Sequence, residues 1–524
     1  MKKTLSLILV LVLCLGLFVG CGGDGKEETV GGNDAGKVEH DGNFDALFDP
    51  ADNVTINLYM SNNNDLEVEN SYANRAIERV IGANVKVTEY DAQDQYDTMI
   101  AENAIPALTY SNGVTMGPTY GPMGAYVDWN TVIDQMPNAK AVISDPKWAE
   151  DVAKYTDENG CLWQLPIMQT GYASIYGYIY RQDIFEENDI DIPTTQEEFY
   201  DVLVELKGLY PNSYPFVMRQ MNKNMQGLEA FAYPWGTNHQ LYGYYGSIMK
   251  FDHENKNYYF AQTSDIMKEC ISFLHQLSTE GLMHPSSLTL DTQSWIEAMA
   301  TGSSFITYDK MDRIAAIQNA AEDDTFALSG FAPIAMGEEG VAESKVGGPT
   351  NYSWLLAANI SEEEKANTIK YVDWLYSQDG ILVTNWGIEG ESYEVAEDGT
   401  WKFKEDFVYE GSGLGVPSIC AYRDIDVFKL AQEENVLEAL EICLPYAKSP
   451  NDPMLHYTED QQIEMDTYYQ TVYDSSLANI QKFILGQRDI DTEWDAYVAE
   501  MEGMHLQELI DIHQAAYDRI YGGK

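Results

Sequence analysis

Basic residues are scarce in this chain: 31 Lys and Arg stand against 84 Asp and Glu among 524 residues, which gives a formal net charge of -53. Such a surface repels both the phosphate backbone of nucleic acids and anionic lipid headgroups. We therefore expect no nucleic-acid partner, and any contact with a membrane requires a covalent anchor.

Cysteine is also sparse, and the catalytic motifs that cysteine, histidine and serine build are missing. Four cysteines lie beyond the N-terminal segment, at spacings that fit no CxxC metal or redox pattern. They allow up to two disulfides or four reduced thiols, and the sequence leaves both open. The eight histidines form no HExxH motif, and no G-x-S-x-G elbow occurs. We expect no metal and no cofactor. These four cysteines are Cys161, Cys270, Cys420 and Cys443.

Only one long hydrophobic run is present, Thr4–Val19, and it follows two lysines at the N-terminus. It is short for a membrane span and a polar stretch follows it, as in a signal peptide. The run ends Phe18-Val19-Gly20-Cys21, which resembles a bacterial lipobox, although Leu is more usual at the place of Phe18. Residues 1–20 are thus predicted to be a signal peptide and Cys21 a lipidation site. An uncleaved anchor and an ordinary signal peptide are the alternatives.

The segment 21–49 is rich in glycine and acidic residues and poor in apolar ones, so it is predicted to be a flexible tether. A tether is useful where a globular part stands off a membrane. One acyl chain anchors a protein only weakly, so we expect more than one on Cys21. The sequence therefore predicts a protein held on the outer face of the cell membrane by lipid.

From Val54 onward the pattern is that of an α/β protein. Apolar residues alternate over 54–60, which predicts a strand with one buried face, and a helix is predicted over 71–81. Strands around 85–87 and 107–110, with a helix between them, complete a βαβαβ order that favours a parallel sheet with right-handed crossovers. Ligands of such sheets bind beyond the carboxyl ends of the strands. Capping boxes predict helix starts at Thr195 and Ser361, and 457–522 is predicted to be mostly helical.

Five stretches, in order along the chain, match sequence motifs of one family. Asp157–Pro166 is similar to its "dGkiyglP" hairpin and Tyr178–Phe185 to its "l.yRkDlf" passage. Ile192–Phe199 is close to "vPtTldEf", Tyr371–Gly380 to "lldwlyseeG" and Asn385–Tyr393 to "yGieGehy". The chain thereby resembles the family 1 extracellular solute-binding proteins, the group that includes maltose-binding protein, and most of all their large Gram-positive lipoprotein members.

Two departures from the family pattern stand out. Ala107 occupies a place where the family usually has an acidic residue. Some relatives carry a calcium loop where this chain has Leu209–Pro215, a stretch without carboxylates, so calcium is not expected there.

The resemblance implies a two-lobed, periplasmic-binding-protein-like α/β fold of type II, with hinge-connected lobes and a helical C-terminal region. Lobe 1 is expected to comprise 50–168 plus 346–415, and lobe 2 169–345 plus 416–524. The implied function is that of a monomeric, non-enzymatic lipoprotein that delivers a sugar or oligosaccharide to the permease subunits of an ABC transporter. A lipid-anchored surface hydrolase or lyase that degrades glycans is the alternative, and the same fold can also host a peptide or a lipid headgroup.

A sugar site needs flat aromatic rings for the apolar ring face and polar side chains for the hydroxyl groups. Strand ends and turns at the implied crossings supply both kinds. For two tryptophans, Trp235 and Trp386, packing inside the protein is an equally open interpretation. The predicted ligand-binding residues are Trp235, Tyr308, Asp309, Arg313, Asn351, Tyr352, Trp354, Trp386, Glu389, Asn62, Asn63, Asn112, Gln169 and Tyr172.

Overall fold

The structure is a computed structural model of the chain. The predicted signal peptide, Cys21 and most of the tether lie outside the residues that it describes. It describes residues 44–522 except 62–68, 70, 91–97, 115, 158, 170–174, 221–225, 238–248, 324, 347–351, 397–398, 405–406, 408–418, 424–426, 428, 430–431, 449–452, 454 and 456.

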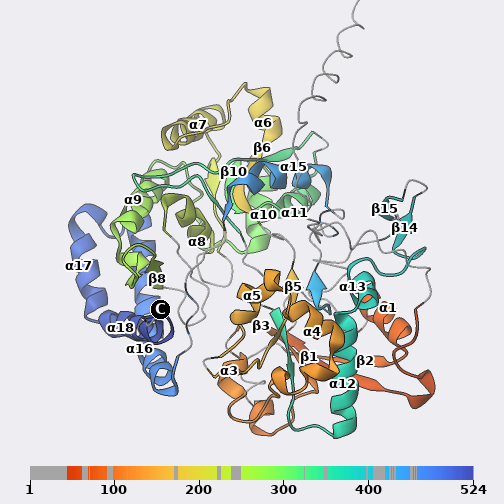
Figure 1. Cartoon of the computed structure of the whole chain (residues 1–524). Coiled ribbons are helices and arrows are strands. Elements are labelled where there is room, and N and C mark those ends of the chain that lie inside the picture. Colours follow the sequence, from red (N-terminus) through yellow and green to blue (C-terminus); the bar gives the residue numbers. More distant parts are fainter. Residues whose placement is uncertain are drawn as a thin grey trace, which may run out of the picture.

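The first lobe is built on a five-stranded sheet in the order β2-β1-β3-β13-β4. Strands β2, β1 and β3 run parallel, as the sequence predicts, whereas β13 is antiparallel to both of its neighbours. In Figure 1 this sheet lies in the lower part of the molecule. The strands are β1 (Thr55–Ser61), β2 (Asn84–Tyr90), β3 (Leu108–Asn112), β4 (Leu165–Pro166) and β13 (Tyr352–Leu356).

Helix α1 (Tyr72–Ile81) shows why the first lobe folds as the pattern predicts. Ser71 caps its start by accepting a hydrogen bond from the Asn74 backbone N–H at 3.1 Å. Its apolar residues recur at helical spacing, and that face is buried against the sheet. The helix ends at Gly82, whose φ of 71° is a left-handed conformation that glycine adopts without a Cβ clash.

Helices from both halves of the chain cover this sheet. The carboxylate of Asp373 on α12 accepts hydrogen bonds from the backbone N–H groups of Asn138 and Ala139, each at 2.9 Å. It thereby caps the start of α4 and ties the late helix to the early one. The covering helices are α3 (Met116–Tyr120), α4 (Pro137–Ile143), α5 (Ala149–Ala153), α12 (Glu362–Leu375) and α13 (Gln378–Asn385). The hairpin of β14 (Tyr393–Val395) and β15 (Trp401–Phe403) packs on Trp386, which follows α13.

The second lobe is built on a four-stranded sheet in the order β11-β6-β10-β7. Strand β6 is antiparallel to β10 and β11, and β7 is parallel to β10. These strands are β6 (Tyr176–Arg181), β7 (Phe216–Val217), β10 (Ile306–Lys310) and β11 (Leu328–Phe331). The hairpin of β8 (Met249–Asp252) and β9 (Asn257–Phe260) and the helices α6 (Gln182–Glu187), α7 (Gln196–Leu209), α8 (Gln226–Ala232), α9 (Asp265–Thr279), α10 (Thr292–Ala300), α11 (Arg313–Ala320) and α15 (Glu434–Cys443) surround it.

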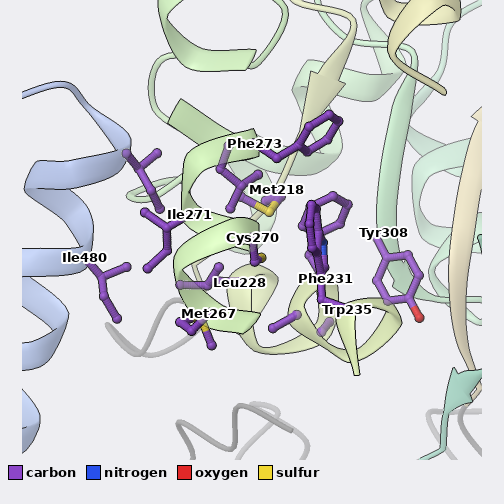
Figure 2. Packing of buried hydrophobic residues seen from close by; sticks show 14 of the residues in the cluster. Met218, Leu228, Phe231, Trp235, Met267, Cys270, Ile271, Phe273, Tyr308 and Ile480 are labelled. Atoms are coloured by element: carbon purple, nitrogen blue, oxygen red, sulfur yellow. The ribbon is translucent and has the colours of Figure 1, made fainter. Parts of the chain in front are cut away.

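The C-terminal region is helical, as predicted, and it extends the core of the second lobe. Figure 2 shows Ile480 of α16 beside Ile271 of α9, with Cys270 and Met267 farther along the same cluster. These side chains are all buried, so the C-terminal helices pack on the second lobe, and among the described residues the first lobe's core cluster contains none of theirs. The helices are α16 (Glu459–Ile484), α17 (Ile490–Glu502) and α18 (Leu506–Tyr521).

Short strand pairs lie where the chain passes between the lobes. β5 (Met168–Gln169) pairs with β16 (Tyr422–Arg423), Ile175 bridges to Val346, and β12 (Ser344–Lys345) pairs with β17 (Ala447–Lys448). The chain therefore crosses more than once, and the pairs β5–β16 and Ile175–Val346 hold the crossing segments side by side. Such an arrangement can act as a hinge.

Two further observations concern the cysteines and the membrane. Cys161, Cys270, Cys420 and Cys443 are all free thiols, so the question that the sequence left open is answered in favour of the reduced state in this structure. Within the part of the chain that the structure describes, no helix combines the length and the apolar character needed to cross a bilayer.

Candidate functional site at the facing ends of the two sheets

The topology decides which strand ends lie at the crossings. β4 runs into the first crossing, so the antiparallel β13 starts there and β3 and β1 end there. On the other side β6 starts at the crossing, so β10 and β7 end there. The facing ends therefore include the carboxyl ends of β1, β3, β7 and β10 and the starts of β6 and β13, and this is where α/β sheets bind ligands.

At the first lobe, a buried glutamine organises the loop that follows β3. Gln164 is fully buried, and its Nε2 donates hydrogen bonds to the Gly113 carbonyl at 2.8 Å and to Ser353 Oγ at 2.7 Å. Its Oε1 accepts from the Gly117 N–H at 2.9 Å. Because a buried amide is costly unless it is hydrogen-bonded, these contacts fix the loop at one position beside the crossing.

Aromatic rings also lie at this end of the first lobe. The rings of Tyr110 and Tyr352 stack with centroids 5.2 Å apart and an interplanar angle of 22°. The guanidinium carbon of Arg423, which comes from the crossing strand β16, lies 5.5 Å from the Tyr352 ring centroid. Tyr352 and Arg423 are both partly exposed, so an aromatic ring and a cation are presented side by side.

At the second lobe, the end of β10 carries a buried ion pair. Asp309 accepts from Arg219 Nε at 2.6 Å and from Arg219 Nη2 at 3.0 Å, a bidentate arrangement. The two side chains are only 5% and 1% exposed. Arg219 also donates to Thr292 Oγ1 and lies 5.1 Å from the ring of Trp295. Burial works against the charged form of Arg219, but the Asp309 carboxylate raises its pKa above the ordinary value.

Next to this pair the chain places three more charged groups, Lys310, Asp312 and Arg313. Burial lowers the pKa of Lys310, and Asp312 and Arg313 act on it with opposite signs. Arg313 Nε and Asp312 Oδ1 are 3.8 Å apart, too far for a hydrogen bond. A sheet end with this charge density is polar, partly buried and suited to hold a polar guest.

Comparisons with known proteins find the same arrangement of two facing sheets in solved structures. The alginate-binding protein AlgQ2 without calcium superposes with a TM-score of 0.71 at 18% identity, over 90% of this chain and 99% of that protein. The Streptococcus pneumoniae ABC-transporter substrate-binding protein FusA in complex with kestose gives 0.69 at 17% identity, over 90% and 100%.

This chain has the fold of an ABC-transporter solute-binding protein.

Among curated proteins, the lipoprotein LipO of Bacillus subtilis is 22% identical over 65% of this chain and 68% of its own length. The fructooligosaccharide substrate-binding protein FusA of Streptococcus pneumoniae is 21% identical over 86% of this chain and 87% of its own length. No protein-family model matches the chain. The predicted resemblance to extracellular solute-binding proteins and the predicted two-lobed α/β fold are confirmed.

Within this solute-binding fold, several predicted ligand residues lie at the facing ends. Tyr352 starts β13, Asp309 lies near the end of β10, Arg313 starts α11 and Gln169 lies on the crossing strand β5. Asn112 ends β3, so its backbone is at the first lobe's end. Contact of these residues with a ligand stays a prediction.

Other predicted residues pack inside the lobes. Tyr308 is 1% exposed and lies in an edge contact with Tyr178 at 4.8 Å between ring centroids, inside the cluster of Figure 2. Trp235 is 2% exposed and packs against Phe273 in the same cluster. In this conformation neither ring has an open face, because other apolar side chains surround it.

Two more tryptophans have partners in the first lobe. Trp354 is fully buried, and its Nε1 donates to the Cys420 carbonyl at 3.1 Å. Trp386 is 2% exposed and stacks on Phe403 at 5.0 Å. Glu389 is exposed in the loop between α13 and β14. The remaining predicted residues, Asn62, Asn63, Asn351 and Tyr172, lie outside the described residues.

Sequence reasoning missed Gln164, Arg219, Lys310 and Arg423. Lys310 follows Asp309 directly, so the end of the predicted strand could have suggested it. Gln164 and Arg219 carry no such signal, because their partners lie far away along the chain. Among the described residues, no group of three or more His, Cys, Asp or Glu side chains is placed to hold a metal ion.

Proposed function

We propose that this chain captures an oligosaccharide between the facing ends of its two sheets and delivers it unaltered to the permease of an ABC transporter. The observation that carries the proposal is the convergence of both sets of strand ends on the crossings, with Tyr352, Arg423, Lys310 and Arg313 beside them. Saccharides fit such a site because they present a flat apolar face and a fringe of hydroxyl groups.

The named relatives support a saccharide over other guests. FusA is described as a fructooligosaccharide-binding protein, and solved structures of similar fold are described as binding human milk oligosaccharides and N-glycans. These proteins belong to transport systems and are not described as enzymes, which favours binding over the alternative of glycan cleavage.

Closure of the lobes would follow from the hinge. The crossing pairs β5–β16 and Ile175–Val346 can bend while each sheet stays intact, so a ligand that touches both lobes favours the closed form. Exclusion of water on closure strengthens the polar contacts.

The lobe boundaries and the anchor belong to the same proposal. Lobe 1 comprises 50–168 plus 346–415 and lobe 2 the remainder, although Cys420 and Ala421 pack with the core of the first lobe and favour a last boundary after β16. Lipid on Cys21, after removal of residues 1–20, would hold a monomer on the outer face of the cell membrane through the tether 21–49. The relative LipO is itself named a lipoprotein.

Calorimetric titration and thermal-shift screening of the mature chain with fructo-, milk and N-glycan oligosaccharides test the function. A ligand that binds only the folded protein raises its melting temperature. At a free ligand concentration about one hundred times Kd, the free energy of unfolding rises by about 2.7 kcal/mol. We expect saturable binding and no new product by chromatography. Release of shorter sugars would instead establish the glycan-degrading enzyme, and failure of every saccharide to bind would refute the proposal.

A further inference from the structure

The end of β10 is more basic than the rest of this acidic chain. The cations Arg219, Lys310 and Arg313 and the carboxylates Asp309 and Asp312 all interact electrostatically there. Three cations thus meet two carboxylates in a chain that has 31 basic and 84 acidic residues. Such a local excess of positive charge is a candidate site for a negatively charged ligand group.

The Asp309 carboxylate is not available as that counter-charge. Its Oδ2 accepts from Arg219 Nε at 2.6 Å, and its Oδ1 accepts from Arg219 Nη2 at 3.0 Å and from the Lys310 backbone N–H at 2.7 Å. Arg219 and Asp309 therefore neutralise each other inside the lobe. Arg313 and Asp312 form a second ion pair, with Nε and Oδ1 3.8 Å apart, so the charge that remains to be matched is that of Lys310.

Lys310 has no carboxylate within ion-pair distance among the residues that the structure describes. Its Nζ lies 5.9 Å from the ring centroid of Tyr176, the residue opposite it on β6. That ring compensates a cation only in part. Burial lowers the pKa of the ammonium group, and the nearby carboxylates of Asp312 and Asp309 offset this only in part.

Asp312 and Arg313 leave polar atoms unmatched beside it. Asp312 Oδ1 and Arg313 Nε are buried atoms without a hydrogen-bond partner in the described part of the chain. Buried donors and acceptors are normally satisfied, so each exception needs an explanation. An arginine N–H and a lysine ammonium next to each other at a sheet end form a binding pair for a carboxylate.

We infer that Lys310, assisted by Arg313, binds a carboxylate group of the ligand, so that the guest is an acidic saccharide that contains uronic acid units. The inference rests on the proposed function and narrows its substrate class. A neutral sugar would offer hydroxyl groups to Lys310 but would leave the ammonium charge without a counter-ion. At physiological ionic strength, salt screens charges more than about 8 Å apart, so the acidic surface elsewhere does not repel an acidic ligand from this site. The nearby cations therefore determine the charge of the ligand that binds.

The test compares acidic oligosaccharides with their own neutral forms. Tetramers of galacturonate, mannuronate and glucuronate are titrated calorimetrically, each beside its carboxyl-reduced form, which keeps the linkage and loses the charge. We expect at least one acidic tetramer to bind, its reduced form to bind at least roughly tenfold more weakly, and its affinity to fall with rising salt.

Variants assign the charge to Lys310. Lys310→Met keeps the length of the side chain and is expected to weaken binding of the acidic tetramer by roughly 10- to 100-fold, whereas Lys310→Arg keeps most of it. Lys482→Met, which removes an exposed lysine on α16, serves as the matched control and should bind like the original chain. The melting temperature of Lys310→Met should not fall, since the change removes a poorly compensated buried charge.

Each other outcome overturns the inference. If a reduced tetramer or another neutral oligosaccharide binds as tightly as any acidic one, the carboxylate assignment is wrong and the proposed function stands. If no saccharide of either kind binds, the inference and the proposed function both fall. If an acidic tetramer binds equally well to Lys310→Met and to the original chain, Lys310 is not its partner.

Discussion

The buried ion pair between Arg219 and Asp309 allows a sharp test of how the second lobe is held together. Replacing Asp309 by Asn keeps the shape and one acceptor oxygen but leaves the arginine charge without its counter-charge. Hydrogen bonds to charged groups contribute about 1.5–3 kcal/mol each, and this pair has two, at 2.6 and 3.0 Å. Thr292 and the Trp295 ring still compensate part of the charge.

We therefore expect Asp309→Asn to lower the free energy of unfolding of the second lobe by about 3–4 kcal/mol, in the range for a broken buried pair. At roughly 2–4 °C for each kcal/mol, the corresponding calorimetric transition should fall by about 10 °C. Urea unfolding followed by tryptophan fluorescence measures the free energy, and Trp295, 5.1 Å from Arg219, reports on the site itself.

The double variant Arg219→Met with Asp309→Asn is the control. Removing both charges should recover at least about 1.5 kcal/mol relative to the sum of the two single changes, since no unpaired charge is left. A loss below about 1 kcal/mol for Asp309→Asn, or additive losses in the double variant, would refute the account of a coupled buried pair.

Three further perturbations follow from other sites. Burial lowers the pKa of His513 to about 4, so between pH 6.5 and 4 the unfolded chain binds a proton at this residue and the folded chain does not. The free energy of unfolding should therefore fall by roughly 3 kcal/mol as the pH drops from 6.5 to 4. Urea titrations at several pH values should show that His513→Leu flattens this dependence. Gly387→Ala should cost about 2 kcal/mol or more in thermal unfolding, because φ is +84° and the new Cβ would lie 2.3 Å from Ser392 Oγ. Gln164→Leu should lower the free energy of unfolding by about 2–3 kcal/mol. It should also weaken saccharide binding, because the loop after β3 loses its hydrogen bonds to Gln164.

Each of these has its own check. A steep pH dependence that survives in His513→Leu would assign the proton uptake to another group. Gly399→Ala has the same left-handed φ, +83°, but nothing within 4 Å of the new Cβ, so it should cost only about 1–2 kcal/mol. Equal losses at both glycines would exclude the steric account, and undiminished binding by Gln164→Leu would separate the loop from the site.

Local sequence patterns predicted the elements of the fold well where the partners lie close in the chain. Thr195 caps α7 by accepting from the Glu198 N–H at 3.1 Å, as predicted. The returning contact differs by one residue, because the Glu198 carboxylate accepts from the Thr194 N–H instead. At α12 the cap by Ser361 also forms, but Glu364 accepts from the Asn57 side chain on β1, a partner that only the folded chain brings near.

The candidate site was harder to predict because burial of a side chain is a tertiary property. Trp235 and Trp386 stand in turn-rich stretches that look accessible, yet Phe273 and Phe403 cover them. Along β10, the strand spacing alone does not reveal that Asp309 forms a buried ion pair with Arg219, a residue far away in sequence. The neighbouring Lys310 is therefore a stronger candidate for ligand contact than Asp309.

The position of β13 governs when the first lobe can become complete during synthesis. This strand fills the gap between β3 and β4, but it is made only after the whole four-stranded sheet of the other lobe. Until Leu356 has been added, β3 and β4 each carry an open hydrogen-bonding edge, and the contacts that close it span a long stretch of chain. The core of the second lobe in turn is complete only after α15 and the C-terminal helices have been synthesised. A nascent chain built in this order completes neither lobe early, which would keep it unfolded for the export that the proposed lipidation of Cys21 requires.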